Sequence, residues 1–236
     1  MERKERRDFV VAGRASTAGG EFDRVSIHGD GHVDGDLACT ELKCHGKSHI
    51  TGNVKASDVR VYGSTRIDGR VESEELQVRG HAEIGGHLSC RKMEAEGVLH
   101  VGGPVTAEEV ALKGQLNVKN DVEAESFSAK GIFTIDGLLN AGQIVVQLYG
   151  DCQAKEIGGE KIEVRKKGFS FWFKSFTHHL EVDTIEGDEI HLENTRAKVV
   201  RGNRVTIGPG CDIGLVEYHD HFHRDHDAKV KESKKL

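Results

Sequence analysis

Proline and aromatic residues are scarce in this 236-residue chain, and their scarcity narrows the choice of fold. There are only 2 Pro, so few positions lack the backbone N–H that a strand uses to pair with its neighbours. Aromatic residues make up 6% of the chain, which is low for a compact globule and ordinary for a solenoid with a thin core. Both observations favour an all-β chain with a narrow core.

Several functional classes lack their sequence signatures. No apolar run is long enough to cross a bilayer, and there is no signal-peptide hydrophobic region, so we expect a cytoplasmic protein. The net charge of −6 gives no reason to expect a nucleic-acid partner. The motifs GxxxxGK(S/T), GxSxG and HExxH are absent, and the five cysteines form no CxxC. We therefore expect no enzyme, no catalytic residue and no cofactor.

Glycine recurs at a fixed interval of 17 residues, and apolar columns repeat with it. Fixed-period self-similarity predicts a solenoid. The first glycine column is Gly29, Gly46, Gly63, Gly80, Gly97, Gly114 and Gly131; the second is Gly35, Gly52, Gly69, Gly86, Gly103, Asn120 and Gly137. Two of the apolar columns are Val33, Ile50, Ile67, Ile84, Val101, Val118, Ile135 and Leu37, Val54, Val71, Leu88, Val105, Val122, Leu139.

Apolar positions inside each repeat lie two residues apart, as do Val25 and Ile27. This is strand spacing, because successive side chains of a strand point to opposite faces. Each repeat is therefore about three short strands joined by turns, and each strand pairs with its counterpart one repeat later. The sequence predicts a β-helix with about 17 residues per coil. Cys39, Cys44 and Cys90 fall in inward columns, which indicates small core residues.

The period defines the expected boundaries. It holds from Val25 to Val146, breaks around an aromatic segment, and returns weakly between Val182 and Val216. We expect a disordered tail over 1–20, a first β-helical part over 21–165, an insertion over 166–180, a second β-helical part over 181–218 and a disordered tail over 219–236.

The repeat I-x-G-x-V/L-x-A, present as Ile50-Thr-Gly52-Asn-Val54-Lys-Ala56, resembles that of the bactofilins, a polymer-forming bacterial cytoskeletal family. The resemblance covers 25–146 and, more weakly, 182–218, and the stretch 185–218 is similar to the second half of longer forms from Gram-positive spore-formers. It implies a right-handed β-helix that polymerises end to end without nucleotide. Such filaments localise partners for cell shape, wall synthesis or motility, and co-assembly with a related subunit stays open.

End-to-end stacking also follows from the expected architecture. A β-helix ends in unpaired backbone groups unless a cap covers them, and no amphipathic helix precedes Val25 or follows Tyr218. We expect the polymerisation surfaces at Val25, Ile27 and Val33 on the first coil and at Val205, Ile207, Ile213 and Val216 on the last.

The insertion concentrates bulky apolar and basic residues, and three interpretations stay open. It is a peripheral membrane contact at the inner face of the membrane, a partner-binding surface, or a segment that seals the β-helix core. Its residues of interest are Lys166, Lys167, Phe169, Phe171, Trp172, Phe173, Lys174 and Phe176.

Histidines suggest a metal only weakly. His28 and His45, like His32 and His49, lie one period apart and should form exposed ladders. Short His-rich tracts can bind metal, but we expect none here; the weak candidates are His219, His221, His223 and His226. Two alternatives to a filament remain: a non-polymerising β-helical adaptor, and a left-handed β-helix acyltransferase, whose hexapeptide repeat does not match a 17-residue period.

Overall fold

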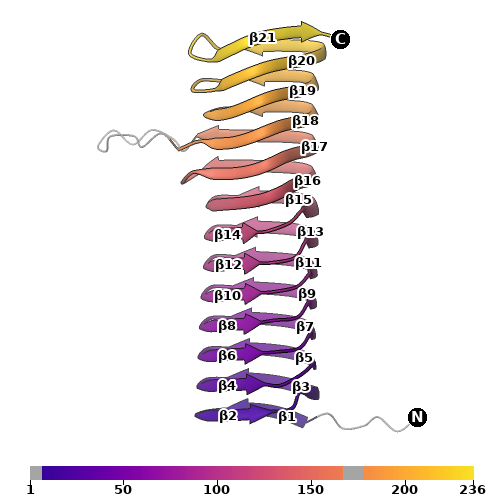
Figure 1. Ribbon diagram of the computed structural model, residues 1–236, viewed down its shortest axis with the longest axis vertical. Coiled ribbons are helices and arrows are strands. Elements are labelled where there is room, and N and C mark those ends of the chain that lie inside the picture. The colour runs from indigo at the N-terminus through magenta and orange to yellow at the C-terminus, as the bar shows by residue number, and fades with distance from the viewer. Residues whose placement is uncertain (1–6, 167–177) are drawn as a thin grey trace, which may run out of the picture. The chain divides into compact units, whose positions relative to one another are not determined.

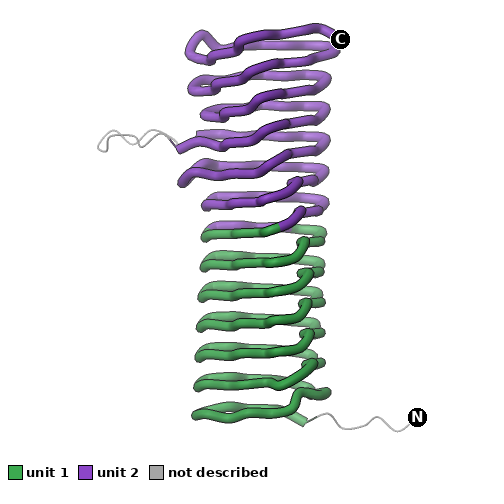
Figure 2. Tube along the Cα trace, in the orientation of Figure 1, with its two compact units in different colours: residues 1–109, 114–119 green, residues 110–113, 120–236 purple. Residues whose placement is uncertain are grey.

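The computed structural model describes residues 7–166 and 178–236, and every regular element in these ranges is a β-strand (Figure 1). The chain forms two compact units, one of residues 1–109 with 114–119 and the other of residues 110–113 with 120–236 (Figure 2). Strand β13 (Val105–Leu112) carries the boundary between them. Each unit is a parallel β-solenoid, as the repeat predicts.

Unit 1 alternates long and short strands. Long strands pair with long strands and short with short, always parallel and in register, so that Leu42 lies beside Val59 and Ile50 beside Ile67. One coil therefore takes 17 residues. The strands are β1 (Arg7–Val11), β2 (Arg14–Thr17), β3 (Gly20–Ile27), β4 (Asp30–Val33), β5 (Leu37–Cys44), β6 (Lys47–Ile50), β7 (Val54–Val61), β8 (Ser64–Ile67), β9 (Val71–Val78), β10 (His81–Ile84), β11 (Leu88–Ala95), β12 (Val98–Val101) and β14 (Gln115–Val118).

Each long strand turns a corner, which explains the spacing of its apolar residues. In β5, Leu37, Cys39, Leu42 and Cys44 are buried, whereas Thr40 and Glu41 both face outward at the bend. The inward phase thus shifts by one residue midway along the strand. Burial of these columns confirms the prediction of a thin aliphatic core, and each buried aliphatic side chain contributes about 1.5–3 kcal/mol before entropy is subtracted.

The first glycine column lies where successive turns are in backbone contact. A Cβ built on Gly63 would lie 2.0 Å from the carbonyl oxygen of Gly46, and one on Gly80 would lie 2.0 Å from that of Gly63. Real Cβ atoms never come this close to backbone. The 17-residue glycine period is therefore a steric requirement of stacking and not only a turn preference.

One buried column does not stand out as apolar in the sequence. It begins with small or polar residues and ends with large apolar ones, and within it the Ser48 hydroxyl donates to Thr65 Oγ1 at 3.0 Å, which satisfies both buried groups. Its members in unit 1 are Gly31, Ser48, Thr65, Ala82, Leu99 and Leu116.

Unit 2 has longer strands that bend without breaking. They pair in parallel in chain order from β15 to β21. The coil length varies: Ile162 pairs with Ile190 across the insertion, Ile190 pairs with Val205, and Val205 pairs with Phe222. The strands are β15 (Val122–Ala129), β16 (Ile132–Leu148), β17 (Cys152–Lys166), β18 (Leu180–Leu192), β19 (Thr195–Ile207), β20 (Asp212–Arg224) and β21 (Lys229–Lys235).

Strand pairing continues on both sides of the insertion. β17 and β18 are neighbours in register, from Cys152 beside Leu180 to Val164 beside Leu192, although residues 167–177 separate them in sequence. Within unit 2, strand pairing therefore passes directly from Cys152–Lys166 to Leu180–Leu192.

The two expected tails form strands, which corrects the sequence interpretation. Residues 7–17 contain β1 and β2, and 219–235 contain the end of β20 and all of β21. The polar composition of these segments indicated disorder. A strand at the end of a stack is nevertheless held in place by its backbone hydrogen bonds to the coil beside it. His28 N–H donates to the Val11 carbonyl at 2.8 Å, and Leu236 N–H donates to the Tyr218 carbonyl at 2.9 Å. Residues 1–6 lie outside the described range.

All five cysteines are buried with free thiols. Burial raises the pKa of Cys90 to about 12 and that of Cys152 and Cys211 to about 11. The thiols of Cys90, Cys152 and Cys211 therefore stay neutral, and these residues act as small core residues. Because their folded pKa values are raised, thiol ionisation favours the unfolded chain once the pH rises above the ordinary thiol value.

Candidate assembly surfaces

The predicted N-terminal surface is covered by a further coil. β1 pairs with β3, which places Phe9 beside Val25 and Val11 beside Ile27, and β2 pairs with β4, which places Thr17 beside Val33. The assignment of Val25, Ile27 and Val33 to the first coil was therefore wrong, because the sequence interpretation took residues 1–20 as disordered. The first coil of the described residues is β1 with β2.

The predicted C-terminal surface is also internal. Each of its four residues has a partner one coil later, so the assignment to the last coil was wrong for the same reason. The pairs are Val205 with Phe222, Ile207 with Arg224, Ile213 with Val230, and Val216 with Ser233. The last coil of the described residues consists of the end of β20 and β21.

The N-terminal edge keeps an apolar character. The Phe9 ring lies 5.5 Å from the Phe22 ring, Val11 is 1% exposed, and Val10 points outward with 63% of its surface exposed. Asp8 Oδ1 accepts the Arg24 N–H at 3.2 Å, which fixes β1 against β3. No described strand pairs with the other edge of β1, so its remaining N–H and C=O groups are able to receive another strand.

At the C-terminal edge, inward positions are polar that are apolar in the preceding coil. The apolar Ile207 is followed by Arg224 and Val216 by Ser233, which is typical of a terminal repeat. β21 is exposed along its length except at Val230, and it carries four lysines. They are Lys229, Lys231, Lys234 and Lys235.

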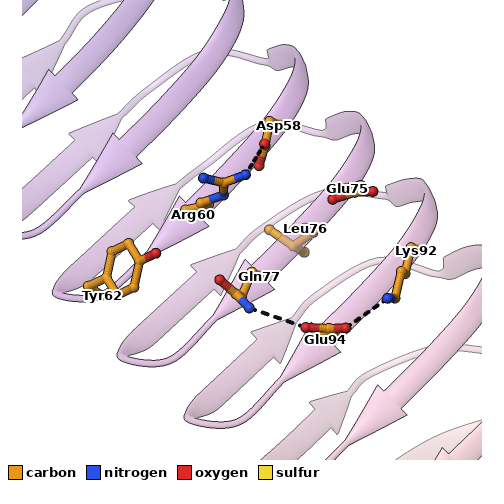
Figure 3. Close-up of a pocket in the computed structure, with 8 residues that line it drawn as sticks. All are labelled: Asp58, Arg60, Tyr62, Glu75, Leu76, Gln77, Lys92 and Glu94. Carbon is orange, nitrogen blue, oxygen red and sulfur yellow. Dashed lines mark hydrogen bonds and ion pairs between the residues drawn. The ribbon is translucent and has the colours of Figure 1, made fainter.

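The lateral faces carry ladders of paired charges. Figure 3 shows a shallow hollow over β7, β9 and β11, where Asp58 accepts from Arg60 at 2.5 Å. Glu94 accepts from Gln77 at 3.2 Å and pairs with Lys92 at 2.9 Å. The remaining lining residues are Tyr62, Glu75 and Leu76. Because its charges neutralise one another at the surface, this hollow has the chemistry of a solvated face.

The histidine pairs lie side by side on neighbouring coils. The rings of His28 and His45 stack at 5.0 Å, and Tyr62 continues the column at 4.6 Å. His32 and His49 are 5.2 Å apart, edge to face.

His49 is held by an acid on the next coil. Its Nε2 lies 2.7 Å from Asp68 Oδ2, and Asp68 also accepts from Arg66 at 2.8 Å. The hydrogen bonds from Arg66 and His49 lower the pKa of Asp68. The histidine therefore belongs to an ion-pair network on the surface.

The C-terminal histidines gather near the last turn. His219, His221 and His223 lie on β20, and the side chain of His226 contacts Asp225 at 3.1 Å and Asp227 at 3.4 Å. The candidate ligand atoms of Asp225, His226 and Asp227 lie within 4.8 Å of one another, on the surface. The sequence analysis gives His226 as a weak candidate ligand but does not group it with Asp225 and Asp227.

The aromatic segment lies almost wholly outside the described residues. Only Lys166, at the end of β17, is described: it is exposed, and its N–H donates to Glu193 Oε2 at 3.0 Å. The residues outside are Lys167, Phe169, Phe171, Trp172, Phe173, Lys174 and Phe176. Within 7–166 and 178–236 there is no helix of the length and apolarity that a membrane crossing needs.

Comparison with known proteins gives a family match in the N-terminal part. Residues 4–89 match the family model Bactofilin, described as polymer-forming cytoskeletal. Residues 4–89 are similar to the bactofilin domain. The match runs through the N-terminal edge and on into β11, so it lies within unit 1.

Two curated relatives are similar to part of this chain. The chain is similar to the uncharacterized protein YhbF of Bacillus subtilis (strain 168), with 46% identity over 101 residues that cover 42% of each chain. It is similar to the uncharacterized protein YhbE of the same strain, with 44% identity over 105 residues, 43% of this chain and 44% of the relative. The chain thus matches less than half the length of either. No solved structure matches it.

Proposed function

We propose that this chain is a cytoplasmic cytoskeletal scaffold that self-assembles end to end, without nucleotide, into filaments that position other proteins for cell shape or motility. The observation that carries the proposal is the N-terminal edge: the described residues leave one side of β1 unpaired, and the bactofilin match includes this strand. Co-assembly with a related subunit is part of the same proposal.

The physical basis is strand addition. An edge strand presents a row of N–H and C=O groups that template another strand at a spacing of about 4.8 Å. At β1 the apolar and exposed Val10 favours covering by protein rather than by water. Stability of a solenoid grows with each interface, so a second copy docked here would extend the same stack.

Lysine at Val10 is expected to weaken assembly. The substitution Val10→Lys puts a charge on the edge strand, a common device against edge pairing, so the sedimented fraction at a fixed concentration should fall at least about fivefold. The control Ile132→Lys adds the same charge at a side chain that is 40% exposed and away from the first coil, and it should sediment like the unchanged protein. Equal sedimentation of both variants would remove the N-terminal edge from the mechanism.

We also propose that the aromatic segment contacts the inner face of the membrane. Its aromatic and basic residues are those that peripheral contacts use, so Trp172→Ala with Phe173→Ala should lower co-sedimentation with phosphatidylglycerol vesicles about tenfold. Tyr149→Ala, at an aromatic that is 42% exposed outside the segment, is the control. If the double variant binds vesicles normally, the membrane contact is wrong; if it no longer folds, the segment seals the core.

A further inference from the structure

Outward columns in the last four coils alternate in sign from coil to coil. One column reads Glu181, Arg196, Asp212 and Lys229, each beside the next in register. A second column, five residues further along each strand, reads Glu186, Arg201, Glu217 and Lys234. Opposite charges directly across a strand pair stabilise it, and like charges destabilise it.

In the second column the alternation produces contacts at Arg201. Arg201 Nε donates to Glu217 Oε2 at 2.7 Å, and its Nη1 lies 3.5 Å from Glu186 Oε2, so one guanidinium joins three coils. The hydrogen bond that Arg201 donates to Glu217 is the main cause that raises the pKa of Arg201. Between β18 and β19, Lys198 also pairs with Asp183 at 2.7 Å.

In both columns the residue on β21 is a lysine. Lys229 and Lys234 are exposed, and neither has an ion-pair partner among residues 7–166 and 178–236. No described strand pairs with the outer edge of β21. A further strand added to this edge would therefore lie beside two unpaired ammonium groups five residues apart. If the alternation of charge continues, that strand carries acidic residues beside Lys229 and Lys234.

A second copy of this edge does not supply those acids. If two β21 strands pair antiparallel about Glu232, Lys229 faces Lys235 of the other copy and the two Glu232 side chains face each other. The N-terminal edge fits no better, because β1 contains a single acid, Asp8. Neither self-pairing thus places acids over both lysines, whereas an acidic strand of another protein does.

We propose that the outer edge of β21 docks an extended acidic segment of another protein by strand addition. The segment has the pattern acidic, apolar, two residues of any type, apolar, acidic. The carboxylates lie over Lys229 and Lys234, and the apolar residues continue the inward positions of Val230 and Ser233. The chain itself uses this pattern at Asp212, Ile213, Val216 and Glu217, the strand on which β21 already rests. Docking goes beyond the proposed scaffold function, because it does not require a filament.

The test uses the strand of this chain that carries the pattern in register with β21. A fluorescein-labelled peptide with the sequence of residues 212–218, DIGLVEY, is titrated with the full chain and followed by anisotropy. We expect saturable binding that weakens with salt, and at least about tenfold weaker binding of the charge-swapped peptide KIGLVKY. Equal binding of the two peptides, or no binding of DIGLVEY at up to about 1 mM chain, overturns the proposal.

Charge reversal on the chain completes the test. The variant Lys229→Glu with Lys234→Glu should bind DIGLVEY at least about tenfold more weakly and should bind KIGLVKY more tightly. Tighter binding of KIGLVKY also shows that the strand is still folded. Lys235→Glu changes the same strand by one charge but lies over Tyr218, outside both columns, and should alter binding less than about threefold. Failure of the swap to restore binding counts against the proposal.

The sedimentation assay separates this inference from the proposed scaffold function. If the charge-reversed variant assembles like the unchanged chain but loses the peptide, the acidic-strand site stands on its own. If it keeps the peptide and loses assembly, β21 is a self-assembly edge and the inference is wrong. If the unchanged chain never assembles, the scaffold proposal fails while peptide binding still decides this site.

Discussion

Alanine at Gly63 is expected to be among the most damaging single substitutions in unit 1. Its Cβ would lie 2.0 Å from the Gly46 carbonyl oxygen, which is backbone and cannot rotate away. Two coils must separate locally, and we expect a loss of about 3 kcal/mol in the free energy of unfolding, read from denaturant midpoints.

Gly13→Ala is the matched control for this prediction. A Cβ at Gly13 meets nothing within 4 Å, and the residue lies in a turn of the first coil. The stability of this variant should stay within about 0.5 kcal/mol of the parent. Equal effects at Gly63 and Gly13 would show that the glycine column serves turn conformation and not the close approach of coils.

Truncation of Phe127 should have the second large effect. This ring is 1% exposed and packs edge to face on Phe133 at 5.5 Å, inside unit 2. Phe127→Ala leaves a cavity in a thin core with few side chains to fill it, so we expect a loss of about 4 kcal/mol. Phe127→Leu keeps most of the volume and should cost about 1 kcal/mol. Comparable melting of the two variants would show that the core relaxes around the cavity.

The regular part of the fold could be read from the sequence because one physical constraint repeats there. Gly46 and Gly63 must be glycine for successive coils to come into contact, and residues such as Leu42 and Val59 must be apolar to fill the core. The 17-residue period is therefore visible in the amino-acid sequence. The column through Ser48 and Thr65 could not be predicted as part of the core, because a buried pair of hydroxyl groups replaces apolar packing there.

The terminal coils could not be predicted for a related reason. A strand at the end of a stack has only one neighbouring coil, so Arg224 and Ser233 take inward positions that are apolar one coil earlier. Their polarity is typical of disorder when the sequence is read locally. The alternation from Glu217 to Lys234 was the available signal, and it becomes visible only once the 17-residue register is extended to the last coil.

The central claim is self-assembly through coil edges, and negative-stain electron microscopy of the purified chain tests it most directly. The sample contains neither nucleotide nor metal and is imaged across a concentration series. The account predicts filaments whose length rises with concentration for the unchanged chain and falls for Val10→Lys. Single particles at every concentration would contradict it and favour an adaptor that binds partners without polymerising.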